Sequence, residues 1–473
     1  MTLFYFLVFV IVAAVLGLGL REHGRIPILL AICGLAVYAL QPALPVRGLD
    51  FWLPTATLGL TVLGWVLTTP RENRTWQDNW PAAAILAGTV LALGLGRYLG
   101  FALPLTASRP PQIFQIIVAL AFLAGAALLL TRFSKPGRLV LSAGFFFIIL
   151  IFVILKVPAL AEWASRILRS WNGQSGSLAS VLDLRWLGFS YIAFRLLHTV
   201  RDRQSGRLPA VSLAEYVVYV IFFPALAAGP IDRIERFVGD LRRPPAVTTD
   251  DLGEVGKRLT LGLFKKFAVA DTLGLVALNA GNAIQVRTAG WAWVLLYAYA
   301  FQIFFDFSGY TDIAIGLGRL LGIKLPENFK APYLKPNLTQ FWNSWHMTLT
   351  QWFRAYFFNP VTRALRSSKK ALSITVIIFI TQIATMVLIG LWHGVTLNFV
   401  LWGMWHGVGL FIHNRWSELT RGRFAALTTG WQKVLNAGGT LLTFHFVALG
   451  WIFFALPTPV ISGQFLLTLV GIH

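Results

Sequence analysis

Long apolar runs, separated by short polar stretches, recur along the whole chain. They constrain the fold more than any other feature, because an α-helix needs roughly 20 apolar residues to cross the hydrocarbon core of a membrane. Candidate spans lie near residues 3–20, 26–45, 51–69, 81–100, 112–131, 139–157, 186–200, 212–230, 259–280, 290–318, 372–391, 396–413, 433–455 and 459–472. The pattern predicts an all-α polytopic membrane protein with about a dozen transmembrane helices.

Composition agrees with a membrane protein and argues against other classes. Of 473 residues, 56% are hydrophobic and 12% are charged, whereas a soluble domain carries about 25% charged residues. The net charge of +21 comes mostly from Lys and Arg in short loops rather than from a nucleic-acid motif, so we expect no nucleic-acid partner. Cys33 is the single cysteine, which excludes an intrachain disulfide and a thiolate metal cluster.

The basic loops predict the topology of the first half. Those at 21–25, 71–74, 132–138 and 201–207 each follow an odd-numbered span, and the loops between them carry fewer Lys and Arg. Since cytoplasmic loops are enriched in Lys and Arg, these four are placed in the cytoplasm and the N-terminus outside, with the first span retained. Segments 231–258 and 324–370 are too polar or broken to be simple spans. Such backbone is tolerated at membrane depth only where protein or a water-filled cavity surrounds it, so we expect the active cavity to be built from the second half of the chain. No internal repeat or long linker occurs, which predicts a single membrane domain.

Two histidines in apolar, Trp-rich sequence, His346 and His393, carry the strongest functional signal. Ionisable residues are costly at membrane depth and usually face a cavity or a partner there, so they predict a membrane enzyme. Residues 337–358 are expected to form one helix with a polar stripe that lines a wet channel and binds substrate. The stripe consists of Asn343, His346, Thr350 and Arg354. The alternative is an interfacial helix with Trp at headgroup level.

His393 has apolar neighbours, and the nearest Lys or Arg is more than a dozen residues away. We expect burial to keep its imidazole neutral and able to accept a proton. Gly390 and Gly394 flank it as a small-xxx-small pair that lets another backbone or a ligand come close. The alternative is a structural histidine hydrogen-bonded to a carbonyl.

Further candidates lie near these histidines or in the next apolar runs. Asn398 and His406, two turns apart, are candidates for the same cavity, and Trp345 and Trp392 for substrate contacts. No His-x-x-x-His with a neighbouring carboxylate occurs, so no metal site is expected.

Two aspartates, Asp306 and Asp312, lie in apolar sequence, where they could be acid–base groups or form a structural polar network. We favour the network, because Arg319 follows Asp312 by about two helical turns. Motifs of serine hydrolases and of nucleotide-binding loops are absent from the sequence, which argues against both classes.

The motifs as a set resemble those of a known family. They are Phe304-Phe-Asp-Phe-Ser-Gly-Tyr-Thr-Asp-Ile-Ala-Ile-Gly-Leu-Gly-Arg319, Leu325-Pro-Glu-Asn-Phe329, Phe341-Trp-Asn-Ser-Trp-His-Met-Thr-Leu349, Gly390-Leu-Trp-His-Gly394 and Trp402-Gly-Met-Trp-His-Gly407, with weaker echoes upstream in Leu187-Gly-Phe-Ser-Tyr191 and Gly262-Leu-Phe-Lys-Lys266. Over roughly 185–415 the chain resembles the membrane-bound O-acyltransferase (MBOAT) family. The branch it resembles is bacterial, that of alginate O-acetyltransferase and the teichoic acid D-alanyl transferase.

The resemblance implies a helical bundle around a central funnel or tunnel, with N-terminal spanning helices at 1–185, a catalytic core at 186–415 and C-terminal helices at 416–473. It implies His393 as the active-site histidine and His346 as the second conserved one. It also implies an acyl thioester co-substrate, acetyl-CoA or an acyl carrier protein, on the cytoplasmic side, and no bound cofactor. The implied acceptor is a hydroxyl of a cell-surface polysaccharide outside the inner (plasma) membrane, reached directly or through an extracytoplasmic acyltransferase partner.

One departure leaves donor and acceptor open. Members of this branch usually read Arg-Asp-Tyr where this chain has Arg354-Ala-Tyr356. D-alanyl transfer from a carrier protein to teichoic acid or a lipid therefore stays an alternative. A non-enzymatic transporter of a lipid-linked sugar is the alternative outside the enzymes, and the lack of an internal repeat argues against it. A membrane scaffold would leave both histidines unexplained.

Overall fold

The computed structural model describes residues 3–19, 24–99, 105–132, 137–243, 248–368 and 372–472. Within these ranges the chain is helical and contains no strand, which confirms the all-α membrane fold. The chain forms two compact units, Met1–Leu259 with Ile313–Leu325, and Thr260–Asp312 with Pro326–His473. The single membrane domain, with internal boundaries after 185 and 415, stays a prediction. Two predicted basic loops, 21–25 and 132–138, lie in part outside the described residues.

The first unit contains the N-terminal helices. They are α1 (Leu3–Gly19), α2 (Arg25–Leu40), α3 (Leu49–Thr68), α4 (Trp76–Leu95), α5 (Ile113–Thr131), α6 (Arg138–Lys156), α7 (Pro158–Trp171), α8 (Phe189–Gln204), α9 (Leu213–Val220) and α10 (Ile234–Leu241). Short 3-10 turns connect them: η1 (Arg71–Asn73), η2 (Gly96–Tyr98), η3 (Gly176–Leu178), η4 (Val181–Leu184) and η5 (Phe223–Ala225). Helices α11 (Thr249–Leu263) and α14 (Ala289–Leu320) have residues in both units.

The second unit contains the segments that the sequence marks as functional. Its elements are the π-helix η6 (Phe264–Ala270), α12 (Asp271–Gly274), α13 (Ala280–Gln285), η7 (Pro332–Leu334), α15 (Leu338–Trp342), α16 (Met347–Phe353), the π-helix η8 (Arg354–Phe358), α17 (Asn359–Arg366), α18 (Ile374–His393), α19 (Leu397–Ala425), α20 (Thr429–Ala455) and α21 (Pro459–Leu469).

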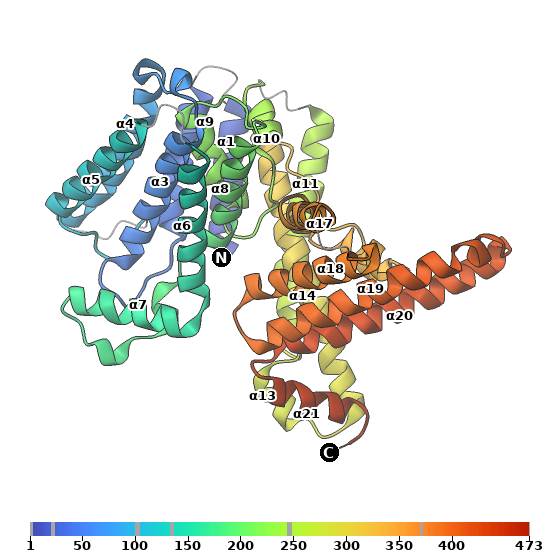
Figure 1. Cartoon of the computed structure of the whole chain (residues 1–473). Coiled ribbons are helices and arrows are strands. Elements are labelled where there is room, and N and C mark those ends of the chain that lie inside the picture. Colours follow the sequence, from blue (N-terminus) through green and yellow to red (C-terminus); the bar gives the residue numbers. More distant parts are fainter. Residues whose placement is uncertain are drawn as a thin grey trace. The chain divides into compact units, whose positions relative to one another are not determined.

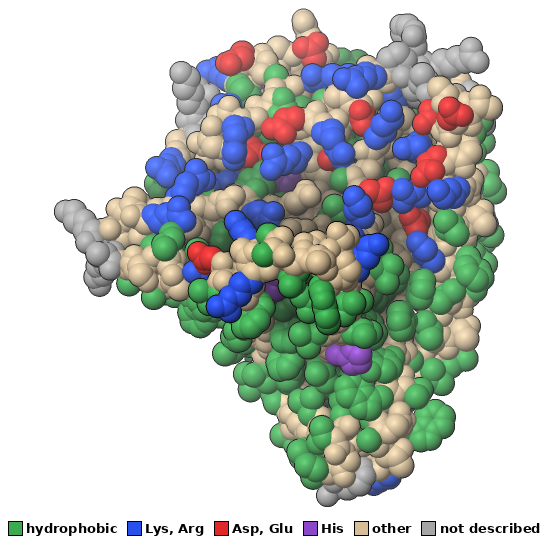
Figure 2. Space-filling model, turned by 90° about the vertical axis from the view of Figure 1, so that its right-hand side faces the viewer, with side chains coloured by type: hydrophobic (Ala, Val, Ile, Leu, Met, Phe, Trp, Pro, Cys, Tyr) green, Lys and Arg blue, Asp and Glu red, His purple; other side chains and the backbone are tan. Residues whose placement is uncertain are grey.

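Six of the predicted apolar stretches form helices that are long and apolar enough to cross a membrane. They are Leu49–Thr68, Trp76–Tyr98, Ile113–Thr131, Arg138–Lys156, Ile374–His393 and Thr429–Ala455. In the view of Figure 2, hydrophobic side chains cover the lower part of the visible face, whereas Lys and Arg gather with Asp and Glu on the upper part. This separation is what a multi-pass membrane protein requires, because charged side chains avoid the hydrocarbon region.

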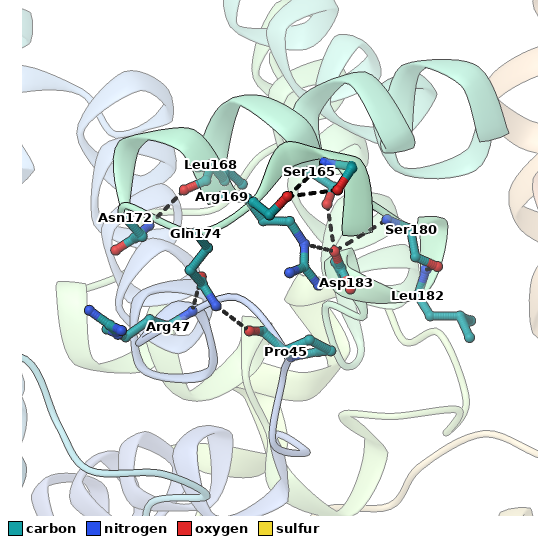
Figure 3. A network of polar contacts seen from close by, with 12 residues as sticks. Pro45, Arg47, Ser165, Leu168, Arg169, Asn172, Gln174, Ser180, Leu182 and Asp183 are labelled. Carbon is teal, nitrogen blue, oxygen red and sulfur yellow. Dashed lines mark hydrogen bonds and ion pairs between the residues drawn. The ribbon is translucent and has the colours of Figure 1, made fainter.

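Helix α7 runs across the end of α6 and is not one of the six candidate spans (Figure 1). It follows directly on α6 because Pro158 begins a new helix at a position where its missing N–H is not needed. A buried polar network ties α7 to η4 (Figure 3). One oxygen of Asp183 accepts hydrogen bonds from Ser165 Oγ at 2.6 Å, from Arg169 Nε at 2.6 Å and from the Ser180 N–H at 3.3 Å.

Replacing Asp183 with Asn should destabilise the α7 segment and lower the thermal midpoint of the purified protein at neutral pH. Burial raises the pKa of the Asp183 carboxyl, but the hydrogen bonds from Arg169, Ser165 and Ser180 outweigh it and hold the pKa below the ordinary value of 3.8. A carboxyl with a lowered folded-state pKa stabilises the fold above its unfolded-state pKa, and that contribution is lost as pH falls. The difference in midpoint should therefore narrow below about pH 4.

The control is Glu162→Gln, which removes the exposed ion pair with Arg166 on the same helix. Exposed pairs contribute little to stability, so this variant should melt like the wild type. Equal midpoints for Asp183→Asn and Glu162→Gln at neutral pH would contradict a stabilising role for the network.

In the second unit, α18 and α19 form a hairpin that is closely packed because glycines face the neighbouring helix. A Cβ at Gly403 would lie 2.5 Å from the Val387 Cα and 2.6 Å from the Met386 carbonyl oxygen. A Cβ at Gly390 would likewise fall inside contact distance of the Phe399 carbonyl oxygen. Of the two glycines beside His393, Gly390 therefore admits another backbone as predicted, whereas Gly394 faces the Phe399 ring. Helix α20 packs along α19, and the two helices extend together (Figure 1).

Gly403→Ala should separate α18 from α19, because the added methyl group meets backbone atoms that cannot rotate away. Overpacking of this kind costs about 1–3 kcal/mol. The matched control is Gly422→Ala on the same helix, where a Cβ meets nothing within 4 Å; it should be neutral or stabilising by up to about 1 kcal/mol. Thermal unfolding in detergent measures both, and an unchanged midpoint for Gly403→Ala would show that the contact tolerates a methyl group.

Candidate functional site

The predicted helix over 337–358 is wrong, because the chain breaks it at His346. Helix α15 ends at Trp342, and α16 begins at Met347. Between them His346 has φ +41°, in the left-handed region that non-glycine residues rarely adopt. Such strain persists only where the surrounding structure enforces it, and it clusters at functional sites.

The segment 328–330 enforces this break. The Met347 N–H donates to the Asn328 carbonyl oxygen at 3.0 Å, and the Lys330 N–H donates to the Ser344 carbonyl oxygen at 3.0 Å. The side-chain oxygen of Asn328 accepts from both the N–H and the hydroxyl of Thr348, at 3.2 and 2.6 Å. These bonds satisfy N–H groups that the start of α16 would otherwise leave unpaired. Asn328 is fully buried, and our sequence analysis named it only within the Leu325–Phe329 motif, without a role.

The predicted polar stripe does not form. Asn343 and Arg354 are exposed and bond to each other, with Arg354 Nη2 2.8 Å from Asn343 Oδ1, whereas His346 is buried. Thr350 is half-buried, and its N–H donates to the His346 carbonyl oxygen at 3.1 Å. The stripe required an unbroken helix. Because His346 itself has a left-handed backbone, its side chain no longer lies on one face with Asn343, Thr350 and Arg354. Beyond Arg354 the chain continues through the π-helix η8 into α17. Substrate binding by Asn343, Thr350 and Arg354 stays a prediction.

The structure brings His346 and His393 to the same indole ring. The ring centroid of Trp392 lies 6.1 Å from that of His346 and 4.4 Å from that of His393. His346 also meets the ring of Phe307 edge-on at 4.7 Å. Two histidines that are distant in sequence therefore share one aromatic contact within the second unit.

His393 is the last residue of α18 and is half-buried, less buried than the sequence led us to expect. Its ring stacks on Phe399 at a centroid distance of 6.0 Å and meets Phe454 edge-on at 4.7 Å and Trp402 at 5.9 Å. The position at a helix end explains the partial exposure, because no further turn of α18 covers the ring. An imidazole held by aromatic rings and open on one side suits contact with a substrate.

His406 on α19 is fully buried behind Trp402. Its ring centroid lies 5.0 Å from that of Trp402 and 5.2 Å from that of Trp342. Neither ring nitrogen has a hydrogen-bond partner among the described residues. Gly450 on α20 leaves room for the ring, since a Cβ there would lie 2.7 Å from His406 Nε2. His406 therefore lies one aromatic layer away from His393.

The remaining candidates have contacts of their own. Trp345 is buried in an aromatic cluster, stacked on Phe341 at 5.6 Å and 5.1 Å from Trp451. The side-chain amide of Asn398 donates to the Leu456 carbonyl oxygen at 2.6 Å and to Ser462 Oγ at 3.0 Å. Roles in substrate binding for Trp345, Trp392, Asn398 and His406 stay predictions. In the described part of the chain no three His, Cys, Asp or Glu side chains are grouped as a metal site would need.

Asp306 and Asp312 on α14 form ion pairs, as a structural network requires. Asp306 pairs with Lys266, and Asp312 Oδ2 lies 2.7 Å from Lys265 Nζ. The partners differ from the one expected, because Arg319 lies 3.7 Å from Asp251 instead. A Cβ at Gly309 would lie 2.8 Å from the Gly262 carbonyl oxygen, so this glycine lets the lysine-bearing segment approach α14. The Lys265-Lys266 pair was visible in the sequence, but its partners were not.

These features define a multi-pass helical membrane protein with a histidine pair around an indole ring, and the comparison with known proteins agrees. The model of the membrane-bound O-acyltransferase family matches residues 145–456. The chain therefore belongs to this family, which consists of acyltransferases. The match extends beyond the resemblance found at 185–415 on both sides.

Relatives of this chain are named for transfer to different polymers. A teichoic acid D-alanyltransferase of Streptococcus thermophilus is 31% identical over 293 residues, 58% of this chain and 68% of that protein. A probable alginate O-acetylase of Pseudomonas fluorescens is 35% identical over 279 residues, 59% of this chain and 52% of that protein. A peptidoglycan O-acetyltransferase of Helicobacter pylori is 32% identical over 244 residues, which cover 51% of this chain and 43% of that protein. The chain thus spans about half the length of the two O-acetyl-transferring relatives.

Gly450→Ala should displace the His406 ring and lower the thermal midpoint, because the new methyl group would overlap Nε2. In a His406→Ala background the same substitution should cost much less, since the overlapping atom is gone; a double-mutant cycle measures this coupling. Gly438→Ala, also on α20 but with nothing within 4 Å, is the control. Additive effects of Gly450→Ala and His406→Ala would contradict the packing of His406 against Gly450.

Proposed function

We propose that the protein transfers an acyl group, acetyl by preference, from a thioester on the cytoplasmic side to a hydroxyl of a cell-surface polysaccharide. The observation that carries the proposal is the contrast among the histidines of the second unit. His393 is half-buried at a helix end, whereas His346 and His406 are fully enclosed. Partial exposure leaves His393 accessible to substrates, whereas His346 and His406 are enclosed.

In the proposed reaction, neutral His393 accepts the proton of the acceptor hydroxyl while the hydroxyl oxygen attacks the thioester carbonyl carbon. The new C–O bond forms, the C–S bond breaks, and the imidazolium of His393 gives its proton to the leaving thiolate. General-base assistance of this kind contributes about 10²–10⁴-fold. Holding donor and acceptor in line supplies much of the rest.

His346 is assigned a positioning role rather than the stripe position that the sequence suggested. It reaches His393 through Trp392, whose ring both histidines contact. The hydrogen bonds around Asn328 fix the backbone at His346, so the ring of Trp392 packs against a rigid partner. Asn343 bonds Arg354 and is left out of this arrangement.

Donor and acceptor follow from the relatives. The names of the relatives include alginate, teichoic acid and peptidoglycan, all polymers of the cell envelope. Acetyl transfer is preferred because two of these three relatives are named for O-acetyl transfer. D-alanyl transfer from a carrier protein is the second candidate, favoured by the teichoic acid relative, of which this chain covers the largest share of the three. We place the protein in the inner (plasma) membrane, with an extracytoplasmic partner completing the transfer where the polymer is remote.

His393→Ala should abolish acyl transfer and leave the protein folded, because the residue is the last of α18 and is not enclosed in the core. The measurement is mass spectrometry of ester-linked acyl groups on envelope polysaccharide from cells that express the wild type, His393→Ala, or neither. Esters should appear with the wild type alone, and their mass identifies the acyl group.

His413→Ala is the matched control, since His413 lies on α19 and bonds Thr339 Oγ1 at 3.2 Å, away from the Trp392 contact. It should retain the esters. Size-exclusion profiles and thermal midpoints confirm that both variants are folded. Equal ester levels in all cells would refute polysaccharide acylation, and consumption of thioester by the purified protein would then test acyl transfer to another acceptor.

A further inference from the structure

Arg74 lies in the connection between α3 and α4, and its guanidinium differs from that of an ordinary loop arginine. Its Nε atom donates to the Thr69 carbonyl oxygen at 2.7 Å. Both Nη atoms are buried, and neither has a hydrogen-bond partner in the part of the chain that the structure describes. A guanidinium carries five N–H donors and stays charged, so buried donors without acceptors are costly.

Two further arginines lie in segments next to Arg74. Arg71 belongs to η1, and Arg203 lies in the last turn of α8. Trp65 Nε1 near the end of α3 donates to the Val211 carbonyl oxygen at 3.0 Å, and the Leu213 N–H donates to Asn79 Oδ1 on α4 at 2.8 Å, so the chain after α8 is held against both sides of the α3–α4 connection. Burial first, and then the positive charges of Arg203 and Arg71, lower the pKa of the Arg74 guanidinium.

The acidic groups near this cluster have other partners or none. Asp202, next to Arg203 on α8, pairs with Arg207 at 3.1 Å. Glu72 is exposed and makes no ion pair within the described ranges. None of the three arginines makes an ion pair with a carboxylate within the described ranges, so an anion from outside the chain would stabilise the cluster.

Exposed tryptophans follow the cluster at the start of α4. Trp76 and Trp80, in the first turns of α4, are 74% and 50% exposed, as is typical of the aromatic belt at the headgroup level. The loops at 71–74 and 201–207 are also two of those that the sequence places in the cytoplasm, and the structure brings them together in the first unit.

We infer that Arg71, Arg74 and Arg203 form a binding site for a phosphate group at the cytoplasmic surface of the membrane. The two free Nη atoms of Arg74 offer the forked pair of donors that binds phosphate oxygens bidentately. The phosphate comes either from the headgroup of an anionic phospholipid or from the thioester donor. Only the second source rests on the proposed function.

The test is binding to the purified full-length protein, measured as ligand-dependent stabilisation in thermal unfolding. The probes are phosphatidylglycerol and coenzyme A, each matched with a molecule that lacks the phosphate, diacylglycerol and pantetheine. The wild type should respond to one phosphate-bearing probe and not to its partner. Arg74→Gln should weaken that binding about tenfold or more, since a charge-assisted hydrogen bond contributes about that factor.

Arg203→Gln is the second variant and keeps the test valid if Arg74→Gln does not fold. The control is Arg207→Gln, whose side chain is 62% exposed and paired with Asp202; it should bind like the wild type. A response to phosphatidylglycerol identifies the lipid as the source, and a response to coenzyme A identifies the donor. No response to either probe, or equal binding by the wild type, Arg74→Gln and Arg203→Gln, overturns the phosphate site. Because the readout is binding, it is independent of whether ester formation is found.

Discussion

The close approach of α18 and α19 is the contact on which the site in the second unit depends. It is possible only because Gly390 and Gly403 present no side chain to the facing backbone. In a bilayer, where apolar surface gains little by leaving lipid, helices associate through such close van der Waals contact. The contact fixes the end of α18, and with it the rings of Trp392 and His393.

A second requirement is that polar groups within an apolar protein find partners. The lysines of η6 meet this requirement by pairing with the aspartates of α14, and Asn328 meets it by binding the N–H groups at the start of α16. In both cases a polar side chain from a non-helical or π-helical segment forms an ion pair or a hydrogen bond with a neighbouring helix. At the start of α16 the backbone hydrogen bonds are thus completed by Asn328 from the same unit, as expected of irregular backbone at membrane depth.

The sequence predicted the helical class, the family and the close approach at Gly390 well, because these depend on local composition and spacing. It failed at residues 337–358, where helix periodicity was strong but His346 adopts a left-handed backbone. That break is imposed by Asn328, which lies about 20 residues before α16 in the sequence. The sequence marks it only as part of the Leu325-Pro-Glu-Asn-Phe329 motif. It failed again for the partner of Asp312, since the pairing with Lys265 depends on how close Gly309 lets a second segment approach. Periodicity cannot predict contacts that long-range packing decides.

Residues Arg354-Ala-Tyr356, where this chain departs from the sequence usual in its branch of the family, lie in the π-helix η8. Arg354 begins the π-helix η8, and its guanidinium bonds the amide oxygen of Asn343. A neutral amide accepts a hydrogen bond but leaves the positive charge uncompensated, whereas a carboxylate would neutralise it. The exposed Arg354 therefore keeps a charge that is available to an anionic group from outside the chain. We therefore expect the residue at position 355 to influence donor or acceptor preference rather than the transfer chemistry proposed for His393.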